Sequence, residues 1–241
     1  MTNHILFVFE GEVTEKQILE GIKHHHLNDL ENTVAYGCYC TDIYSLFSKI
    51  EKDEDLDLFA LIKEHTKNPH LADVKRDQVS EIFLFFDYDG HAPAASDTKI
   101  DAMLRFFDEE TERGKLYISY PMVESLKHLK APGHFKDLAV PCKVNIKYKS
   151  LAHSQHLPGA GDFTKIKAPI WKNILLEHCS KMNYIVHGAF ELPEDYIDQE
   201  EIFSAQRSKY INKSSTVSVL SAFPVFICDY YGCSKLAEFV S

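Results

Sequence analysis

The chain has 241 residues, of which 45% are hydrophobic, and its formal net charge at neutral pH is −10. This length and composition suit a globular chain that can bury a substantial core. The acidic balance argues against binding nucleic acid through overall positive charge, although it leaves room for a local basic groove.

The cysteines and the apolar runs predict a reduced, cytoplasmic protein without a membrane segment. The six cysteines include no C-x-x-C pair, and the N-terminus has no basic region followed by a long apolar one. The longest apolar run, residues 217–231, contains Pro224 and Asp229 and is too short to span a bilayer. We therefore interpret this run as part of the core.

Short apolar runs alternate with helical patterns in the first half of the chain. The sequence predicts strands at residues 5–9, 33–40, 82–86 and 115–120. Helices are expected after them, from Thr14, from Asp42 through about residue 65, around residues 100–107, and from Pro121. This alternation predicts an α/β fold with a mostly parallel sheet flanked by helices, in which sites gather at the carboxyl ends of the strands.

The pattern weakens from about residue 131. Residues 143–149 are predicted to form a strand and residues 158–162 a loop, while residues 170–179, 199–211 and 216–230 have helical patterns. No repeat or low-complexity linker marks a boundary. We therefore expect residues 1–130 to form the core and residues 131–241 to be a mostly helical elaboration of the same domain.

Acidic residues follow three of the predicted strands. Glu10 follows the first strand, Asp87 and Asp89 follow a later one, and Glu124 comes after the next. Neighbouring strands bring such carboxylates within reach of one ion, and Mg²⁺ and Mn²⁺ prefer oxygen ligands. Two metals with a phosphodiester between them would permit hydrolysis. Any single acid after a strand is more commonly a solvated turn residue, but the coincidence at three strand ends favours a metal site.

The stretches "FVFEGEVTE", "FFDYDGH" and "YISYPMVESL" resemble the metal site of the Toprim fold. Within that superfamily they are most similar to the compact RloB-like and OLD-like nucleases of bacterial anti-phage systems. The likeness covers roughly the first 130 residues. It implies that Glu10 is a ligand and general base, that Asp87 and Asp89 are ligands, and that Glu15 and Glu124 are supports or ligands to a second ion.

The resemblance also implies a catalytic lysine and a protein partner. OLD-like enzymes carry a lysine late in the Toprim domain that can stabilise a phosphorane. Lys147 and Lys149 are the candidates here; spacing does not choose between them, and Lys149 is carried forward as the catalytic residue. Such nucleases commonly work beside an ABC-type or SMC-like ATPase. Because the sequence has no G-x-x-x-x-G-K-S/T loop, ATP hydrolysis would come from that separate subunit.

The predicted function is therefore a Mg²⁺- or Mn²⁺-dependent nuclease that hydrolyses DNA or RNA, including tRNA, as the toxic effector of an anti-phage abortive-infection system. A homodimer is left open. One alternative is a phosphatase, since "IFLFFDYDGH" resembles the first motif of haloacid dehalogenases, with Asp87 as nucleophile and Asp89 as acid/base. That motif normally continues to Thr, where this chain has His91. The other alternative is a Toprim-like module that binds without cutting.

Overall fold

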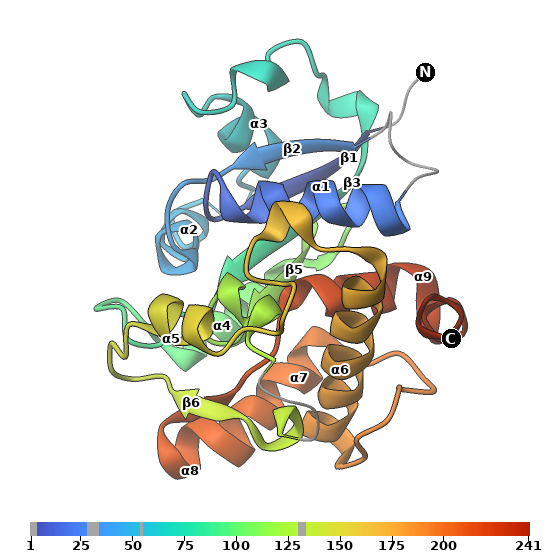
Figure 1. Ribbon diagram of the computed structural model, residues 1–241. Helices are drawn as coiled ribbons and strands as arrows, with labels where there is room; N and C mark the ends of the chain where they lie inside the picture. The colour runs from blue at the N-terminus through green and yellow to red at the C-terminus, as the bar shows by residue number, and fades with distance from the viewer. Residues whose placement is uncertain (1–3, 28–33, 54, 130–133) are drawn as a thin grey trace. The chain divides into compact units, whose positions relative to one another are not determined.

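The computed structural model describes residues 4–27, 34–53, 55–129 and 134–241 (Figure 1). The chain divides into two compact units, each of which is described by itself. Unit 1 consists of Met1–Phe86 and Thr98–Leu116, and unit 2 consists of Asp87–Asp97 and Tyr117–Ser241.

The central element is a five-stranded, mostly parallel sheet with strand order β2-β1-β3-β5-β4. Its strands are β1 (His4–Phe9), β2 (Val34–Cys38), β3 (Val79–Asp87), β4 (Asp108–Glu109) and β5 (Gly114–Ser119). β1 runs parallel to both neighbours, so that Phe9 lies opposite Cys38 on one side and Phe85 on the other. The predicted α/β sheet is thus confirmed, whereas the short antiparallel pairing of β4 with β5 was not predicted.

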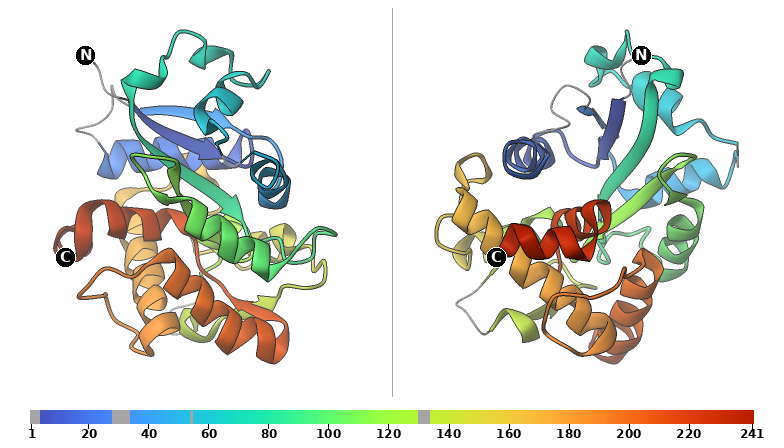
Figure 2. Two further views of the ribbon diagram at one scale, coloured as in Figure 1. Left: turned by 180° about the vertical axis from the view of Figure 1, so that it is seen from behind. Right: turned by 90° about the vertical axis from the view of Figure 1, so that its right-hand side faces the viewer.

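Helices cover both faces of the sheet in unit 1. α1 (Thr14–His26) lies on one face, and α2 (Ile43–Ile50) and α4 (Asp97–Phe106) lie on the other (Figure 2). This double cover explains why residues 5–9 of β1 and 82–86 of β3 are all apolar, and Leu6, Val8 and Leu84 are completely buried.

The helix predicted from Asp42 through about residue 65 is wrong as a single element. It is two helices, α2 and α3 (Leu58–Lys63). The side chain of Asp42 accepts the Ser45 N–H at the start of α2, and Asp57 accepts the Ala60 N–H at the start of α3. Each aspartate therefore caps a new helix, which explains why the helical pattern restarts.

Unit 2 is built mainly of helices. They are α5 (Tyr148–Ser154), α6 (Ala168–His187), α7 (Gln199–Gln206), a π-turn (Arg207–Ile211), α8 (Asn212–Ser214) and α9 (Ala222–Val240). α6 packs against both α7 and α9. Short 3-10 turns elsewhere in the chain lie at Pro69–Leu71, Arg76–Gln78, Val123–Lys127, Phe135–Asp137 and Phe163–Lys165.

A small two-stranded sheet in unit 2 was not predicted. β6 (Ala139–Pro141) pairs antiparallel with β7 (Thr216–Ser218). On the other side of β7, the side-chain amide of Gln206 donates to the Ser218 carbonyl at 2.7 Å and accepts the Ser218 N–H at 2.9 Å. The predicted helix at 216–230 is therefore correct only from residue 222 onward, where α9 begins.

Two further predictions in this part of the chain are wrong. The helix expected from Pro121 is only the 3-10 turn Val123–Lys127, which follows a cis Tyr120–Pro121 peptide. The strand expected at 143–149 is absent from these described residues. Instead, the Asn145 side chain accepts the Lys147 N–H at 2.9 Å, a local turn that leads into α5. Over the described ranges, none of the helices combines the length and apolar character needed to cross a bilayer.

Candidate functional site

The first predicted acid, Glu10, follows β1 in unit 1. Its N–H donates to the Phe85 carbonyl at 3.2 Å and thereby continues the pairing of β1 with β3. Glu15, in the first turn of α1, is buried, and its Oε1 accepts the Gly11 N–H at 3.1 Å. A Cβ on Gly11 would lie 2.8 Å from the Glu15 carboxylate, so glycine permits this close approach. Glu15 therefore supports the loop that carries Glu10.

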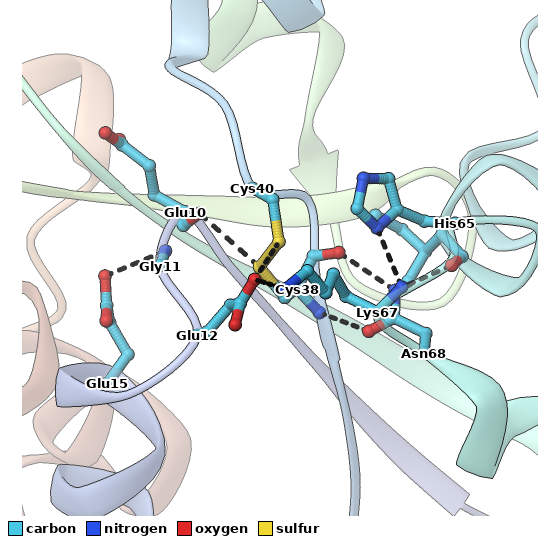
Figure 3. The surroundings of a disulfide bond; sticks show 10 residues. Glu10, Gly11, Glu12, Glu15, Cys38, Cys40, His65, Lys67 and Asn68 are labelled. Atoms are coloured by element: carbon cyan, nitrogen blue, oxygen red, sulfur yellow. Dashed lines mark hydrogen bonds and ion pairs between the residues drawn. A yellow bond between two sulfur atoms is a disulfide. The ribbon is translucent and has the colours of Figure 1, made fainter.

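A disulfide joins Cys38 to Cys40 beside this loop (Figure 3). The prediction that the cysteines are all reduced is thus wrong for this pair, because the two cysteines at the end of β2 are separated by one residue and do not form a C-x-x-C motif. Cys142, Cys179, Cys228 and Cys233 are free. The sulfur of Cys38 lies 3.7 Å from the Glu10 carbonyl oxygen.

Asp87 ends β3 and opens the first segment of unit 2. Its side chain is buried, and a network around Tyr88 holds the segment that follows. The Tyr88 hydroxyl donates to Asp97 Oδ1 at 2.5 Å, and Lys143 Nζ donates to the same hydroxyl at 2.8 Å. Lys143 also lies 3.1 Å from Asp97 Oδ1. These contacts fix the start and the end of residues 88–97 together.

In the turn after Asp87, the residue with the unusual backbone conformation is Asp89 rather than Gly90. Asp89 has the left-handed backbone, with a φ of 42°. Gly90 is required for space instead, since a Cβ there would lie 2.4 Å from the Tyr88 ring and 2.9 Å from the Cys142 carbonyl oxygen. Asp89 Oδ1 lies 3.9 Å from His91 Nδ1, so the two side chains form an ion pair when the histidine is protonated.

Glu124 is the most deeply buried acid of the predicted set in unit 2. Its side chain is 3% exposed, and its Oε1 lies 3.2 Å from Lys149 Nζ, whose side chain is 73% exposed. Its other oxygen, Oε2, is buried without a hydrogen-bond partner among the described residues. A buried carboxylate oxygen left in this condition is costly, which makes it a strong candidate to hold a cation.

Tyr148 links Glu124 to Asp87 electrostatically. Burial raises the pKa of Tyr148 well above its usual value, and the charges of Glu124 and Asp87 raise it further. The hydroxyl lies 3.0 Å from Nδ1 of His128, whose Nε2 lies 3.1 Å from Gln155 Oε1. Because the amide oxygen can only accept, Nε2 carries the proton and the Tyr148 hydroxyl donates to Nδ1. Tyr148 is therefore held protonated beside the acids.

Sequence reasoning missed Lys127, which is buried three residues after Glu124. Burial lowers the pKa of Lys127, Glu124 raises it, and Lys149 lowers it. Its Nζ also lies 4.7 Å from the centre of the Phe163 ring. The spacing of Glu124 and Lys127 was a usable signal, because residues three apart share a side of a helical turn.

A pocket of about 260 Å³ opens in unit 2 next to these groups. Its lining combines acidic, basic and apolar side chains, among them Asp89, His91, Met122, Lys147, Tyr148 and Lys149. Lys149 thus lines the pocket while it pairs with Glu124. The two lysines and His91 offer donors to an anion, although the chain as a whole is acidic.

Of the predicted site residues, unit 2 brings together Asp87, Glu124 and Lys149, with Asp89 on the wall of the pocket. Lys149 reaches the site from a helix rather than from the predicted strand. Glu10 and Glu15 belong to unit 1 and are associated there through the Gly11 loop.

The residues of unit 2 fit a hard divalent cation better than zinc. Within the described residues, no group of three or more His, Cys, Asp or Glu is placed to hold a metal ion. Structural zinc needs four protein ligands, whereas Mg²⁺ is commonly held by one or two carboxylates and completes its shell with water and substrate phosphate. The unsatisfied Oε2 of Glu124 is a candidate ligand of this kind, and the charge of Asp87 acts on the same Tyr148 as that of Glu124.

Comparisons with known proteins do not identify a relative: no protein-family model, no curated protein and no solved structure matches this chain. The chemistry of the site therefore has to be argued from its own residues. They comprise buried carboxylates with one oxygen unsatisfied, a protonated tyrosine, and lysines on the wall of a pocket. This set can hold a cation and an anion side by side.

Proposed function

We propose that the chain is a divalent-metal-dependent nuclease that hydrolyses phosphodiester bonds. The observation that carries the proposal is the state of Glu124, whose Oε2 is buried and unsatisfied while its Oε1 pairs with a lysine on the pocket wall. A cation at Oε2 would satisfy the carboxylate, and a phosphate in the pocket would meet Lys149. The predicted Toprim resemblance supports the same chemistry.

Each group of unit 2 has a distinct role in the proposal. Asp87 and Glu124 hold the metal, which when bound neutralises phosphate charge and activates water. Lys149, whose side chain is exposed, contacts a non-bridging phosphate oxygen, where developing charge is stabilised. Tyr148, kept protonated, donates a hydrogen bond to His128.

Glu10 enters the proposal through the resemblance, as ligand and general base. Its loop is held by the buried Glu15, which acts as the support rather than as a ligand. Glu10 directly follows β1 and Asp87 is the last residue of β3, so both are held by rigid strands. A variant of Glu10 tests this role separately from the groups of unit 2.

The substrate is a nucleic acid, DNA or RNA, including structured RNA such as tRNA. This substrate class is supported by the pocket and not by the overall charge. The net charge of the chain is −10, but the pocket wall presents Lys147, Lys149 and His91. With few cations available, substrate capture depends on the metal to offset phosphate charge, and binding weakens as salt rises. The cellular role as a toxic anti-phage effector restrained by a partner ATPase is carried by the resemblance.

The test is cleavage of supercoiled plasmid and of total cellular RNA by the purified full chain with Mg²⁺, Mn²⁺ or EDTA. We expect metal-dependent cutting that is lost in Asp87→Asn, Glu124→Gln and Glu10→Ala. Two matched controls replace exposed acids by their amides, Asp73→Asn and Glu112→Gln, and should cut normally. Mn²⁺ binding measured by calorimetry should weaken in Asp87→Asn and Glu124→Gln and be unchanged in the controls.

Two results contradict the proposal. One is cutting that survives EDTA or persists in Asp87→Asn and Glu124→Gln. The other is an absence of cutting combined with equal growth of bacteria that express the wild type or these variants, since a restrained toxin still harms cells once it is overproduced. A phosphoryl group found on Asp87 by mass spectrometry after incubation with a phosphate monoester would instead establish the phosphatase alternative.

A further inference from the structure

The Cys38–Cys40 disulfide lies at the carboxyl end of β2 and against the loop that follows β1 (Figure 3). Cys38 Sγ is 3.7 Å from the Glu10 carbonyl oxygen, and Cys40 Sγ is 3.7 Å from Glu12 Oε1. All of these residues belong to unit 1. The disulfide therefore contacts the Glu10 loop at two places, the main-chain carbonyl of Glu10 and the side chain of Glu12.

The surroundings suit the reduced pair as well as the oxidised one. A disulfide sulfur has no proton to donate, so the two oxygens near the sulfurs accept nothing from them in the oxidised state. After reduction, the Cys38 thiol has the Glu10 carbonyl as an acceptor and the Cys40 thiol has Glu12. Glu12 is itself held by Lys67, at 2.9 Å. The reduced state therefore leaves neither thiol without a hydrogen-bond acceptor.

The two cysteines differ in how firmly their main chains are held. The buried Asn68 accepts the Cys38 N–H at 2.8 Å and donates to the Cys38 carbonyl at 2.9 Å. Asn68 is anchored in turn by the Ile62 carbonyl, at 2.7 Å. Cys40 instead has a left-handed backbone, with a φ of 61°, which a non-glycine residue adopts only when its surroundings impose it. The cross-link to the fixed Cys38 provides that constraint.

We propose that Cys38 and Cys40 are a reversible thiol–disulfide switch that controls the order of the Glu10–Glu15 loop. In the oxidised state the cross-link pins Cys40 beside Glu12 and holds the loop. In the reduced state the cross-link no longer constrains Cys40, only a weak thiol hydrogen bond joins it to Glu12, and the loop loosens. The inference stands on unit 1 alone and does not require the proposed nuclease activity.

The reductant is a dithiol, either a small molecule or a protein with two neighbouring cysteines. One of its thiolates attacks Sγ of Cys40, the more exposed residue of the pair, which breaks the S–S bond and expels Cys38 as a thiolate that takes up a proton. The second reductant thiolate then attacks the mixed disulfide and expels Cys40, which is also protonated. Two electrons and two protons pass to the protein, and the reductant becomes a cyclic disulfide.

The experiment combines alkylation with hydrogen exchange on the full chain under native conditions. Protein equilibrated with oxidised glutathione is compared with protein reduced by dithiothreitol, each treated with iodoacetamide and mapped by mass spectrometry. We expect Cys38 and Cys40 to be alkylated only after reduction, and the bond to re-form when oxidised glutathione is restored. Amide exchange in residues 10–15 should become several-fold faster in the reduced protein.

Variants separate the switch from general effects of reductant. Cys40→Ser should show fast exchange in residues 10–15 with or without dithiothreitol. Cys233→Ser, which removes a partly exposed free cysteine, should respond to reductant like the wild type. Alkylation of Cys38 and Cys40 after equilibration with oxidised glutathione would overturn the proposal, and so would unchanged exchange in residues 10–15 on reduction. Neither readout depends on cleavage, so a failed nuclease assay leaves this test intact.

Discussion

Lys149 and Glu124 form an ion pair between an exposed cation and a buried anion. Their side chains are 73% and 3% exposed, and Nζ lies 3.2 Å from Oε1. Breaking the ion pair costs the lysine ammonium group little, because solvent can solvate it. The carboxylate would then lose the partner of Oε1, and its Oε2 already has no hydrogen-bond partner among the described residues. This asymmetry makes Glu124 the energetically demanding partner and Lys149 the adaptable one.

Lys149→Met should therefore destabilise unit 2 by roughly 1–3 kcal/mol, because it removes a partner from a buried charge. The matched control is Lys165→Met, which breaks an ion pair with Asp162 whose partners are both exposed, and it should cost much less because solvent screens the pair. Urea unfolding at neutral pH measures both changes. Equal costs for the two variants would show that Glu124 does not depend on Lys149.

Glu15 should stabilise the loop after β1 through its hydrogen bond with the Gly11 N–H. Glu15→Gln keeps an acceptor for the Gly11 N–H, whereas Glu15→Ala removes it and leaves a partly buried donor unsatisfied. We expect Glu15→Ala to be less stable than Glu15→Gln by about 1–2 kcal/mol. The measurement is the free energy of unfolding, with Glu20→Ala as a control at an exposed position of the same helix. Equal stabilities of the two Glu15 variants would refute this role.

The free energy of unfolding should fall as the pH is lowered from about 6.5 towards 3, in part because of His178. Burial lowers the pKa of His178 from 6.5 to about 3. Nδ1 accepts the Ser221 N–H at 3.2 Å and Nε2 lies 3.3 Å from the Leu126 carbonyl oxygen, so the ring is held neutral. Above pH 6.5 the histidine is neutral in both the folded and the unfolded chain, so its full contribution to stability is present. As the pH falls from 6.5 towards 3, only the unfolded chain takes up a proton at this residue, and the folded state loses stability relative to it.

Burial, with His25, also lowers the pKa of His26 to about 4, which acts over the same range. His178→Gln should therefore flatten the pH dependence only partly. Chemical denaturation at a series of pH values gives the slope. His187→Gln, at an exposed position near the end of the same helix, is the control and should leave the slope unchanged. An unaltered slope in His178→Gln would contradict the assignment.

Lys181 should be essential for packing the segment before β6. It is fully buried in α6 and donates to the carbonyls of Phe135 and Leu138, both at 2.6 Å. Lys181→Met keeps much of the side-chain volume but leaves two acceptors without their donor, at a cost of about 2–5 kcal/mol. Lys136→Met, which removes only a contact with the Tyr184 ring, should cost far less. Thermal unfolding compares the two, and similar losses would argue against the buried bonds.

The sequence predicts the strands of the sheet well because their signal is local. Residues 5–9 and 82–86 are continuously apolar, and only a strand covered on both faces explains such short runs. Positions decided by distant contacts are predicted poorly. Residues 143–149 have the alternation of a strand, but none of the strands in the described part of the chain pairs with them, and the Asn145 turn leads into a helix.

The candidate site shows the same division. Asp87 and Glu124 follow strands, so their grouping follows from chain order, and both contribute to the pKa of Tyr148. Tyr148 itself was not foreseen, because a single tyrosine in a polar stretch has no pattern that reports burial. The sequence shows Cys38 and Cys40 two residues apart. Whether two such cysteines form a disulfide depends on how the main chain turns between them, and only the fold determines this.

The amide side chain of Gln206 imitates a neighbouring strand, since it offers one donor and one acceptor to the main chain of Ser218. β7 is bonded to β6 along its other edge, so at Ser218 the outer edge of this small sheet is already occupied. Exposed strand edges recruit further strands and lead to aggregation. The Gln206 side chain thus occupies the position where a third strand would bond to Ser218. It does so from helix α7, without adding a residue to the sheet.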